Sequence, residues 1–244
     1  MKSDDEKTIF DGIDDSGGKD LEPIDDLALR WTRRMWDAQL WTNVSWLGFP
    51  ILQWPTDMVI LQEIVFAERP GAIIETGSHC GGSAVYFASL LQWIGGGKVI
   101  SIDIHPVPEE FRKRIDDLPF GDSIHFVTGD SAAENTLARV RELVGDETAV
   151  LVVLDSDHGY AHVKREIAAY EGFVPDGGSF VVGDTICREL SVLPGREAWA
   201  ADNPRRAADE FLAETDEFVR ESRYEKFKVT FFPGGFLRRV KREV

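Results

Sequence analysis

Five successive apolar stretches of this chain each end in an acidic residue or are followed by one. These acidic residues are Glu75, Asp103, Asp130, Asp155 and Asp184. If these stretches are strands of an open α/β sheet, the acids lie beyond the carboxyl ends of the strands, where such sheets bind ligands. A purely structural sheet has little reason for the pattern, because each acid costs desolvation energy near the rim. The pattern therefore predicts a binding site along one edge of a sheet.

The first of these acids belongs to the most informative stretch, residues 72–83, with the sequence AIIETGSHCGGS. A short apolar strand is followed by a loop with three glycines, Gly77, Gly81 and Gly82, and then by a segment of helical composition at 84–93. Such a loop lets the backbone approach a ligand closely and points free N–H groups at it. A nucleotide-like cofactor is the natural occupant.

The residues around the loop favour one cofactor class. Asp103 can accept hydrogen bonds from two ribose hydroxyls, in a dinucleotide or in S-adenosylmethionine (SAM) alike. The loop reads G-S-H-C-G-G, whereas the dinucleotide fingerprint is G-x-G-x-x-G. Glu75, two residues before Gly77, suits the cationic amino acid end of SAM and repels a pyrophosphate. These residues favour SAM over a dinucleotide.

The elements that must position these residues alternate between strand and helix. Strands are predicted at 72–74, 99–104, 123–128, 149–154 and 179–182, and helices at 84–93, 133–144, 160–173 and 204–222. This order predicts an α/β fold with a doubly wound, mostly parallel, Rossmann-like sheet. Residues 227–232 and 236–240 flank Pro233-Gly234-Gly235, which predicts a C-terminal antiparallel hairpin. Such a hairpin favours the methyltransferase variant of the sheet.

The chain divides into three predicted parts. Residues 1–20 are polar and acidic, which is typical of a disordered tail. Residues 21–70 form an N-terminal helical extension with helices at 21–40 and 56–68, and residues 71–244 form the cofactor-binding domain. Trp31, Trp36, Trp41 and Trp46 recur every five residues, so they cannot share one helical face. Packing is favoured for them over a substrate-binding role.

Composition narrows the partners. The net charge of −16 over 244 residues argues against nucleic acid, which requires a basic face. No apolar run is long enough for a membrane span, and the acidic N-terminus does not resemble a signal peptide. Two cysteines without metal spacing fit a reducing cytoplasm. We expect a cytoplasmic protein acting on a small molecule, and the exposed aromatic segment makes a homo-oligomer plausible.

Several motifs together resemble the cephalosporin hydroxylase/rhamnosyl O-methyltransferase family. They are W-P-T-D-M at 54–58, I-I-E-T-G at 73–77, G-G-S at 81–83, V-I-S-I-D at 99–103 and L-D-S-D-H at 154–158. The family consists of class I SAM-dependent enzymes of natural-product tailoring, often metal-dependent. The resemblance implies a SAM-dependent O-methyltransferase that acts on a hydroxyl group of a sugar or another natural product.

The resemblance also implies roles for individual residues. Those expected to bind SAM are Glu75, Gly77, Ser78 and Ser83 at the methionine end, Asp103 at the ribose, and Asp130 and Ser131 at the adenine. The expected ligands of a divalent cation, Mg²⁺ above all, are Asp155 and Asp184, and the expected catalytic residues are Asp155 and His158, the latter as general base. Mg²⁺ binds carboxylates and can position hydroxyl groups, and a neutral imidazole can accept a proton near pH 7.

One position departs from the family. Relatives commonly have two adjacent acidic or amide ligands at the end of the fifth strand, and here the pair is Gly183-Asp184. Water, Thr185 or Asp157 can complete the cation site, or the cation can be weakly bound or absent.

Rival functions stay open beside the transferase. An NAD-dependent oxidoreductase requires the stricter glycine fingerprint. An iron- and 2-oxoglutarate-dependent hydroxylase requires two histidines and a carboxylate on one metal, and no H-x-D motif is present. A non-catalytic protein with the SAM-binding fold stays open because of Gly183.

Overall fold

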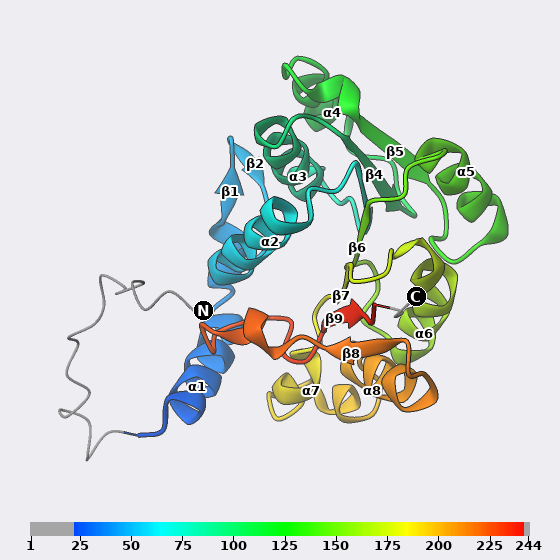
Figure 1. The fold of residues 1–244 in the computed structure, drawn as a ribbon. Coiled ribbons are helices and arrows are strands. Elements are labelled where there is room, and N and C mark those ends of the chain that lie inside the picture. The colour runs from blue at the N-terminus through cyan, green and yellow to red at the C-terminus, as the bar shows by residue number, and fades with distance from the viewer. Residues whose placement is uncertain (1–21, 242–244) are drawn as a thin grey trace, which may run out of the picture.

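A seven-stranded sheet in the order β5-β4-β3-β6-β7-β9-β8 runs through the centre of the molecule (Figure 1). The structure is a computed structural model that describes residues 22–241, so the predicted acidic tail at 1–20 lies outside the described residues. The first five strands in this order are parallel, and β9 is antiparallel to both of its neighbours. The strands are β3 (Ala72–Thr76), β4 (Lys98–Asp103), β5 (Ile124–Thr128), β6 (Val150–Leu154), β7 (Ser179–Val182), β8 (Phe218–Arg220) and β9 (Phe236–Arg239).

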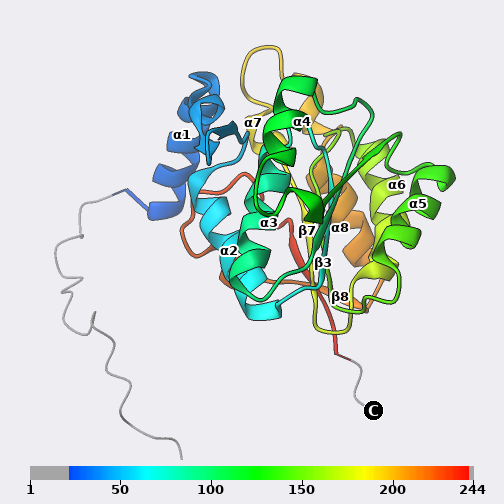
Figure 2. The same cartoon turned by 90° about the horizontal axis from the view of Figure 1, so that it is seen from above.

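Helices cover both faces of this sheet, as Figure 2 shows. On one face, α2 and α3 pack with the tip of α1 and with Ile73 and Val99 in one hydrophobic cluster. On the other face, α5, α6 and α8 pack with Ile74 and Ile100 in a second cluster. The helices are α1 (Ile24–Asp37), α2 (Pro55–Glu68), α3 (Gly82–Trp93), α4 (Glu109–Asp116), α5 (Glu134–Val144), α6 (Tyr160–Tyr170), α7 (Cys187–Leu190) and α8 (Pro204–Glu214). The predicted doubly wound α/β fold is confirmed.

The register of the sheet brings the strand-end acids together. Thr76 at the end of β3 pairs with Ile102 of β4 on one side and with Leu154 of β6 on the other. Asp103 and Asp155 follow these partners directly, so they end their strands at the same level. Because parallel strands share one carboxyl edge, residues 26 to 79 positions apart in the sequence converge there.

The C-terminal antiparallel pair is present, but one predicted strand was wrong. Strand β9 pairs with Phe218–Arg220, which the sequence placed in a helix at 204–222, and not with residues 227–232. Helix α8 ends at Glu214, and Phe218 turns inward against Phe180 and Phe211. In the segment 227–232, the Phe231 N–H donates to the carboxylate of Asp57 instead of to a sheet partner.

The N-terminal part of the described chain packs against the α2–α3 face. Residues 45–50 form a short antiparallel hairpin of β1 (Ser45–Trp46) and β2 (Phe49–Pro50). Trp36 stacks on Trp41 with ring centroids 5.1 Å apart and contacts Phe231 edge-on. The Trp46 indole N–H donates to Ser89 Oγ of α3 at 2.9 Å. Packing, the favoured role for the tryptophans, is therefore present for Trp36, Trp41 and Trp46, whereas Trp31 is 53% exposed.

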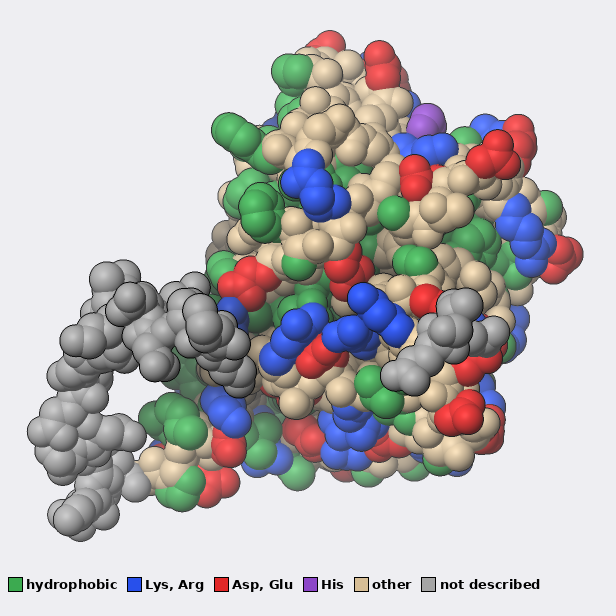
Figure 3. Space-filling view, viewed as in Figure 1, with side chains coloured by type: hydrophobic (Ala, Val, Ile, Leu, Met, Phe, Trp, Pro, Cys, Tyr) green, Lys and Arg blue, Asp and Glu red, His purple; other side chains and the backbone are tan. Residues whose placement is uncertain are grey.

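The surface in Figure 3 mixes acidic and basic side chains over its lower half, while hydrophobic side chains gather at the upper left, over α2 and the β1–β2 hairpin. Helix α2 exposes Val59 and Phe66, with 44% and 64% of their surfaces accessible. Among residues 22–241, none of the helices combines the length and the apolar character that a membrane span requires.

Candidate active site

The glycine loop after β3 is held between two other segments. Gly77 has a φ of +97°, and a Cβ on it would overlap the carbonyl oxygen of Asp155. A Cβ on Gly82, the first residue of α3, would overlap the carbonyl oxygen of Pro50. Glycine is thus required at both positions by close backbone approach. The loop is pressed against the end of β6 on one side and against the N-terminal extension on the other.

Two neighbouring cavities open along the carboxyl edge of the sheet. The first, of about 300 Å³ and here called the β4 cavity, is lined by Gly77, Ile102, Asp103, Ile104, Gly129, Asp130, Ser131, Ser156, Asp157 and His162. The second, of about 460 Å³, has Trp36, Trp41 and Trp199 in its wall and is here called the tryptophan cavity. Gly77, Asp103 and Ser156 line both. One extended ligand centred on Asp103 can therefore occupy the two cavities together.

Asp103, at the centre, is held rigidly. One of its carboxylate oxygens accepts the backbone N–H of His79 and the other that of His105, both at 2.9 Å. These bonds orient the carboxylate and leave the remaining lone pairs free to accept hydrogen bonds from a ligand. The site that the sequence predicted for a ribose is therefore occupied by a preorganised acceptor.

Glu75 lies beneath the loop and is almost fully buried, with 2% of its surface accessible. The Ser101 hydroxyl donates to its carboxyl at 2.6 Å, and Ser83 also bonds to it. Burial raises the pKa of Glu75 to about 7, although these hydroxyl bonds oppose the shift. Ser78 and Ser83 line the tryptophan cavity directly above it. The predicted methionine-end residues are thus gathered in one place.

Asp130 and Ser131 form the far end of the β4 cavity. The backbone N–H of Ala132 donates to Asp130 at 3.0 Å, and this bond, together with Arg165 at 3.3 Å, lowers the pKa of Asp130. Ser131 Oγ lies 3.1 Å from His162 Nε2 and donates to Glu166 Oε1 at 2.5 Å.

His162 lines the same cavity, and it was not predicted to be there. The available signal was its spacing of four residues from Glu166, which puts both side chains on one face of α6. His162 thus lies in the cavity wall, while its partner Glu166 lies on the buried side of α6.

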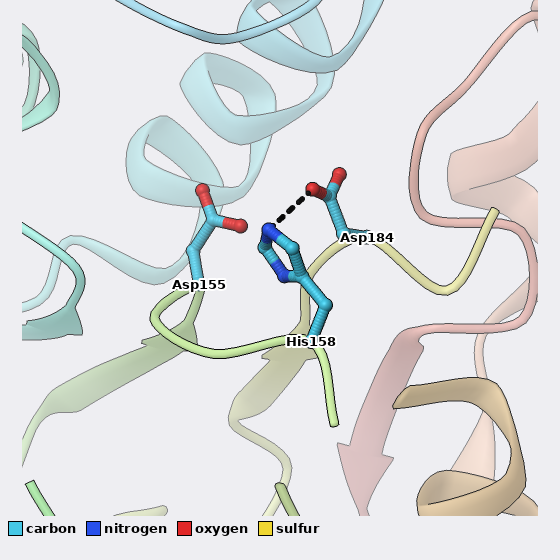
Figure 4. A group of neighbouring side chains, drawn as sticks. All are labelled: Asp155, His158 and Asp184. Atoms are coloured by element: carbon cyan, nitrogen blue, oxygen red, sulfur yellow. Dashed lines mark ion pairs between the residues drawn. The ribbon is translucent and has the colours of Figure 1, made fainter. Parts of the chain in front are cut away.

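Asp155, His158 and Asp184 meet in the tryptophan cavity (Figure 4). One ligand atom from each lies within 4.8 Å of the other two. His158 Nε2 is 3.1 Å from Asp184 Oδ2. The sequence predicted these three side chains as neighbours, and the ends of β6 and β7 bring them together.

The carboxyls of this group repel one another. Burial raises the pKa of Asp155 well above its ordinary value, and the charges of Asp184 and Glu75 raise it further. Burial also raises the pKa of Asp184, against the opposing effect of His158. Asp184 adopts a φ of +45°, which is uncommon for a residue with a side chain. Such a site favours a positive partner.

Gln53 was not predicted, and it contacts the centre of the site. Its Nε2 donates to Asp155 Oδ2 at 2.5 Å, while its buried Oε1 has no hydrogen-bond partner in the part of the chain that the structure describes. A buried amide oxygen without a partner is uncommon and points to a missing donor. No sequence pattern relates Gln53 to Asp155, because they are 102 residues apart.

The outer wall of the tryptophan cavity brings helix α1 together with the segment 196–199. Trp36 of α1 contacts Trp199 edge-on, with centroids 6.0 Å apart. The Arg196 guanidinium lies over the Trp199 ring, 4.7 Å from its centroid. Trp41 also lines this cavity. Trp36 and Trp41 therefore pack against other aromatic rings and also line this cavity.

Comparison with known proteins decides the family. A family model for rhamnosyl O-methyltransferase/CmcI matches residues 38–240. The chain belongs to this family. The rhamnosyl O-methyltransferase of Mycobacterium leprae (strain TN) is 30% identical over 222 residues, which cover 90% of this chain and 93% of that protein. The rhamnosyl O-methyltransferase of Mycobacterium tuberculosis (strain H37Rv) is also 30% identical over 222 residues, covering 88% and 86%.

Solved structures share the fold. A structure of CmcI with Mg and SAM has a TM-score of 0.59 at 20% identity, covering 82% of this chain and 77% of that one. An O-methyltransferase from Bacillus cereus in complex with SAH has a TM-score of 0.55 at 19% identity, covering 89% and 91%. With the family match, they confirm the predicted class, a SAM-dependent O-methyltransferase.

Proposed function

We propose that this chain transfers the methyl group of SAM to a hydroxyl group of a sugar or another natural-product scaffold, with a divalent cation, expected to be Mg²⁺, at Asp155 and Asp184. The observation that carries the proposal is the convergence of Asp103, His158 and Asp155 on one cavity behind an aromatic wall. A cofactor and an acceptor can meet there.

The two neighbouring cavities support the proposed binding of the cofactor. Asp103 would accept the ribose hydroxyls, since its carboxylate is already oriented by two backbone N–H groups. Asp130 and Ser131 would lie at the adenine in the β4 cavity. The methionine end would extend over the glycine loop, bound by Glu75, Gly77, Ser78 and Ser83. The buried carboxyl of Glu75 would then face the cofactor's ammonium group.

The donor set fits a cation. Asp155 and Asp184 are carboxylates that burial and mutual repulsion disfavour without a positive charge between them. A bound cation would hold the acceptor's oxygens in place and lower the pKa of the hydroxyl that is methylated. A solved CmcI structure contains Mg and SAM, which supports the metal in that protein.

The transfer itself requires a nucleophilic oxygen in line with the methyl group and the removal of one proton. The acceptor's oxygen forms a bond to the methyl carbon, the carbon–sulfur bond breaks, and SAM leaves as S-adenosylhomocysteine (SAH). Asp155 and His158 are the proposed catalytic residues, because they face the cavity where the acceptor must sit. Since SAM is already activated, positioning should supply most of the rate.

The aromatic wall is the surface that we propose for binding the methyl acceptor. Flat faces of Trp36, Trp41 and Trp199 can cover the apolar face of a sugar ring, and polar groups beyond them can bind its hydroxyls. The curated relatives are named for rhamnosyl transfer, which supports a sugar acceptor here. The expected homo-oligomer rests on exposed apolar side chains such as Phe66, and light scattering of the purified protein tests it.

The test uses methyl α-L-rhamnoside and catechol as two hydroxyl probes. SAM should bind by isothermal titration, and SAH should form with the rhamnoside when Mg²⁺ is added. Formation of SAH with catechol alone would contradict the sugar acceptor, and formation without any cation would contradict the metal. Absence of SAM binding would contradict the whole proposal.

A further inference from the structure

We propose that His158 Nε2 is the third ligand of the cation, so that the site has two oxygens and one nitrogen and prefers Mn²⁺, Co²⁺ or Zn²⁺ to Mg²⁺. This inference rests on the proposed function for the presence of a cation. It makes His158 a ligand instead of the general base expected from the resemblance, because one lone pair cannot serve both, and the proton of the methylated hydroxyl group then passes to water in the cavity.

The geometry places the nitrogen where a ligand would be. His158 Nε2 lies 3.1 Å from Asp184 Oδ2, and one carboxylate oxygen of Asp155 completes a set within 4.8 Å. Figure 4 shows Nε2 turned toward the two carboxyl groups, while the other ring nitrogen faces away from them. The nitrogen that a proton acceptor would offer to a substrate therefore points between two acids.

Other candidates for a third protein ligand are engaged elsewhere. Gly183 has no side chain, and a Cβ there would lie 2.5 Å from Asp155 Oδ1 and 2.8 Å from the carbonyl oxygen of Leu154. Thr185 Oγ1 donates to the carbonyl oxygen of Pro233 at 2.9 Å. Asp157 Oδ1 accepts the N–H of Gly159 at 2.7 Å. His158 is the neighbouring side chain whose donor atom points into the gap.

Gln53 is independent evidence that this gap holds a ligand. It is buried, with 7% of its surface accessible, and it lines the same cavity. Its Nε2 orients Asp155 from one side, while its Oε1 is without a partner among residues 22–241. An unsatisfied buried acceptor is expensive, and a water bound to a cation would be a suitable donor.

The donor set determines the preference. Mg²⁺ takes oxygen ligands almost entirely. Imidazole suits first-row transition metals and Zn²⁺, whose affinities rise from Mn²⁺ through Co²⁺. One nitrogen beside two carboxylates should therefore favour Co²⁺ over Mg²⁺.

Direct binding measurements on the full-length, chelator-treated protein test the assignment. Co²⁺ titration is followed by visible absorption, Mg²⁺ affinity by competition, and bound Mn²⁺ by pulsed EPR for coupling to ¹⁴N. Co²⁺ should bind at least about tenfold more tightly than Mg²⁺. His158→Gln should weaken Co²⁺ binding at least about tenfold, the lower end of the loss seen even for outer partners of metal ligands. It should also abolish the ¹⁴N coupling.

His79→Gln is the matched control, because His79 lines the same cavity outside the three-residue group. It should leave the ¹⁴N coupling unchanged. Mn²⁺ bound to the wild-type protein without ¹⁴N coupling would overturn the inference whether or not a variant folds, as would Mg²⁺ binding more tightly than Co²⁺. SAM titration separates the two proposals. SAM binding without cation binding would contradict this inference and the cation of the proposed function but leave the methyl transfer standing, whereas Co²⁺ bound through nitrogen without SAM binding would contradict the methyl transfer and leave this inference standing.

Discussion

Replacing Glu75 with glutamine should stabilise the cofactor-free protein at alkaline pH and weaken SAM binding. Glu75 is buried beneath the glycine loop, where two serine hydroxyls bond to its carboxyl. Glutamine has the same shape and carries no charge, so it removes the desolvation penalty. It also removes the negative charge proposed to face the ammonium group of SAM. Stability and function should therefore change in opposite directions.

The magnitude follows from the pKa. Burial raises the pKa of Glu75 from 4.5 to about 7, so between these values the folded protein holds a proton that the unfolded chain releases. Stability therefore falls as pH rises through this window and levels off above it. Between pH 5.5 and pH 7 the loss is about 2 kcal/mol, at 1.36 kcal/mol per pH unit. For a chain of this size that corresponds to ~4–8 °C in melting temperature.

Thermal unfolding of the cofactor-free wild type and of Glu75→Gln between pH 5.5 and pH 8 measures the effect. The difference in melting temperature should grow in favour of the variant over this range. Asp57→Asn is the matched control: Asp57 is 1% accessible and its pKa is also raised to about 7 by burial, but it binds Thr230 and the Phe231 N–H. It should show a similar pH trend and an unchanged SAM affinity.

Two results would refute the reasoning. A constant melting-temperature difference between Glu75→Gln and wild type across the range would mean that Glu75 is not held protonated by burial. An unchanged dissociation constant for SAM in Glu75→Gln, measured at pH 8, would mean that the carboxyl does not bind the cofactor. Each result concerns a separate step, so one can fail while the other holds.

Three further substitutions test other parts of the site. Asp103→Asn should weaken SAM binding at least about tenfold in calorimetry, since a hydrogen bond to a charged group contributes about 1.5–3 kcal/mol; unchanged binding would remove Asp103 from the ribose site. Gly82→Ala should lower the free energy of unfolding by about 1–3 kcal/mol in a urea titration, because its Cβ overlaps the Pro50 carbonyl. Trp199→Ala should raise the KM for the methyl rhamnoside and leave SAM affinity unchanged; an equal loss of both would contradict an acceptor-side wall.

The parts of the fold that the sequence predicted well are those specified by nearby residues. Strand β6 is an uninterrupted apolar run, and all five of its residues are buried. The glycine loop was equally recognisable, because Gly77 and Gly82 are required by local backbone approach. The segment 227–232 has strand-like composition, yet Asp57 on α2 accepts its Phe231 N–H. A contact across 174 residues overrode the local preference.

The same distinction holds for the site. Asp155 and Asp184 were predictable because a parallel sheet places all its strand ends at one edge. Gln53 and Trp199 were not, because each reaches the cavity from a segment whose position depends on tertiary packing. Residues 50–54 are held by the close approach of Pro50 to Gly82, and no periodic pattern in the sequence indicates that contact.

The buried acids of the site link its stability to its ligands. Glu75 is buried and Asp155 and Asp184 are partly buried near it, and the pKa of each is raised, which means that their ionised forms destabilise the empty protein at neutral pH. The proposed ligands, a cation and a cofactor with sulfonium and ammonium groups, are positively charged. Their binding would offset this repulsion and stabilise the folded chain through mass action. The carboxylates that make the empty site unfavourable are then the source of its affinity for a positively charged cofactor.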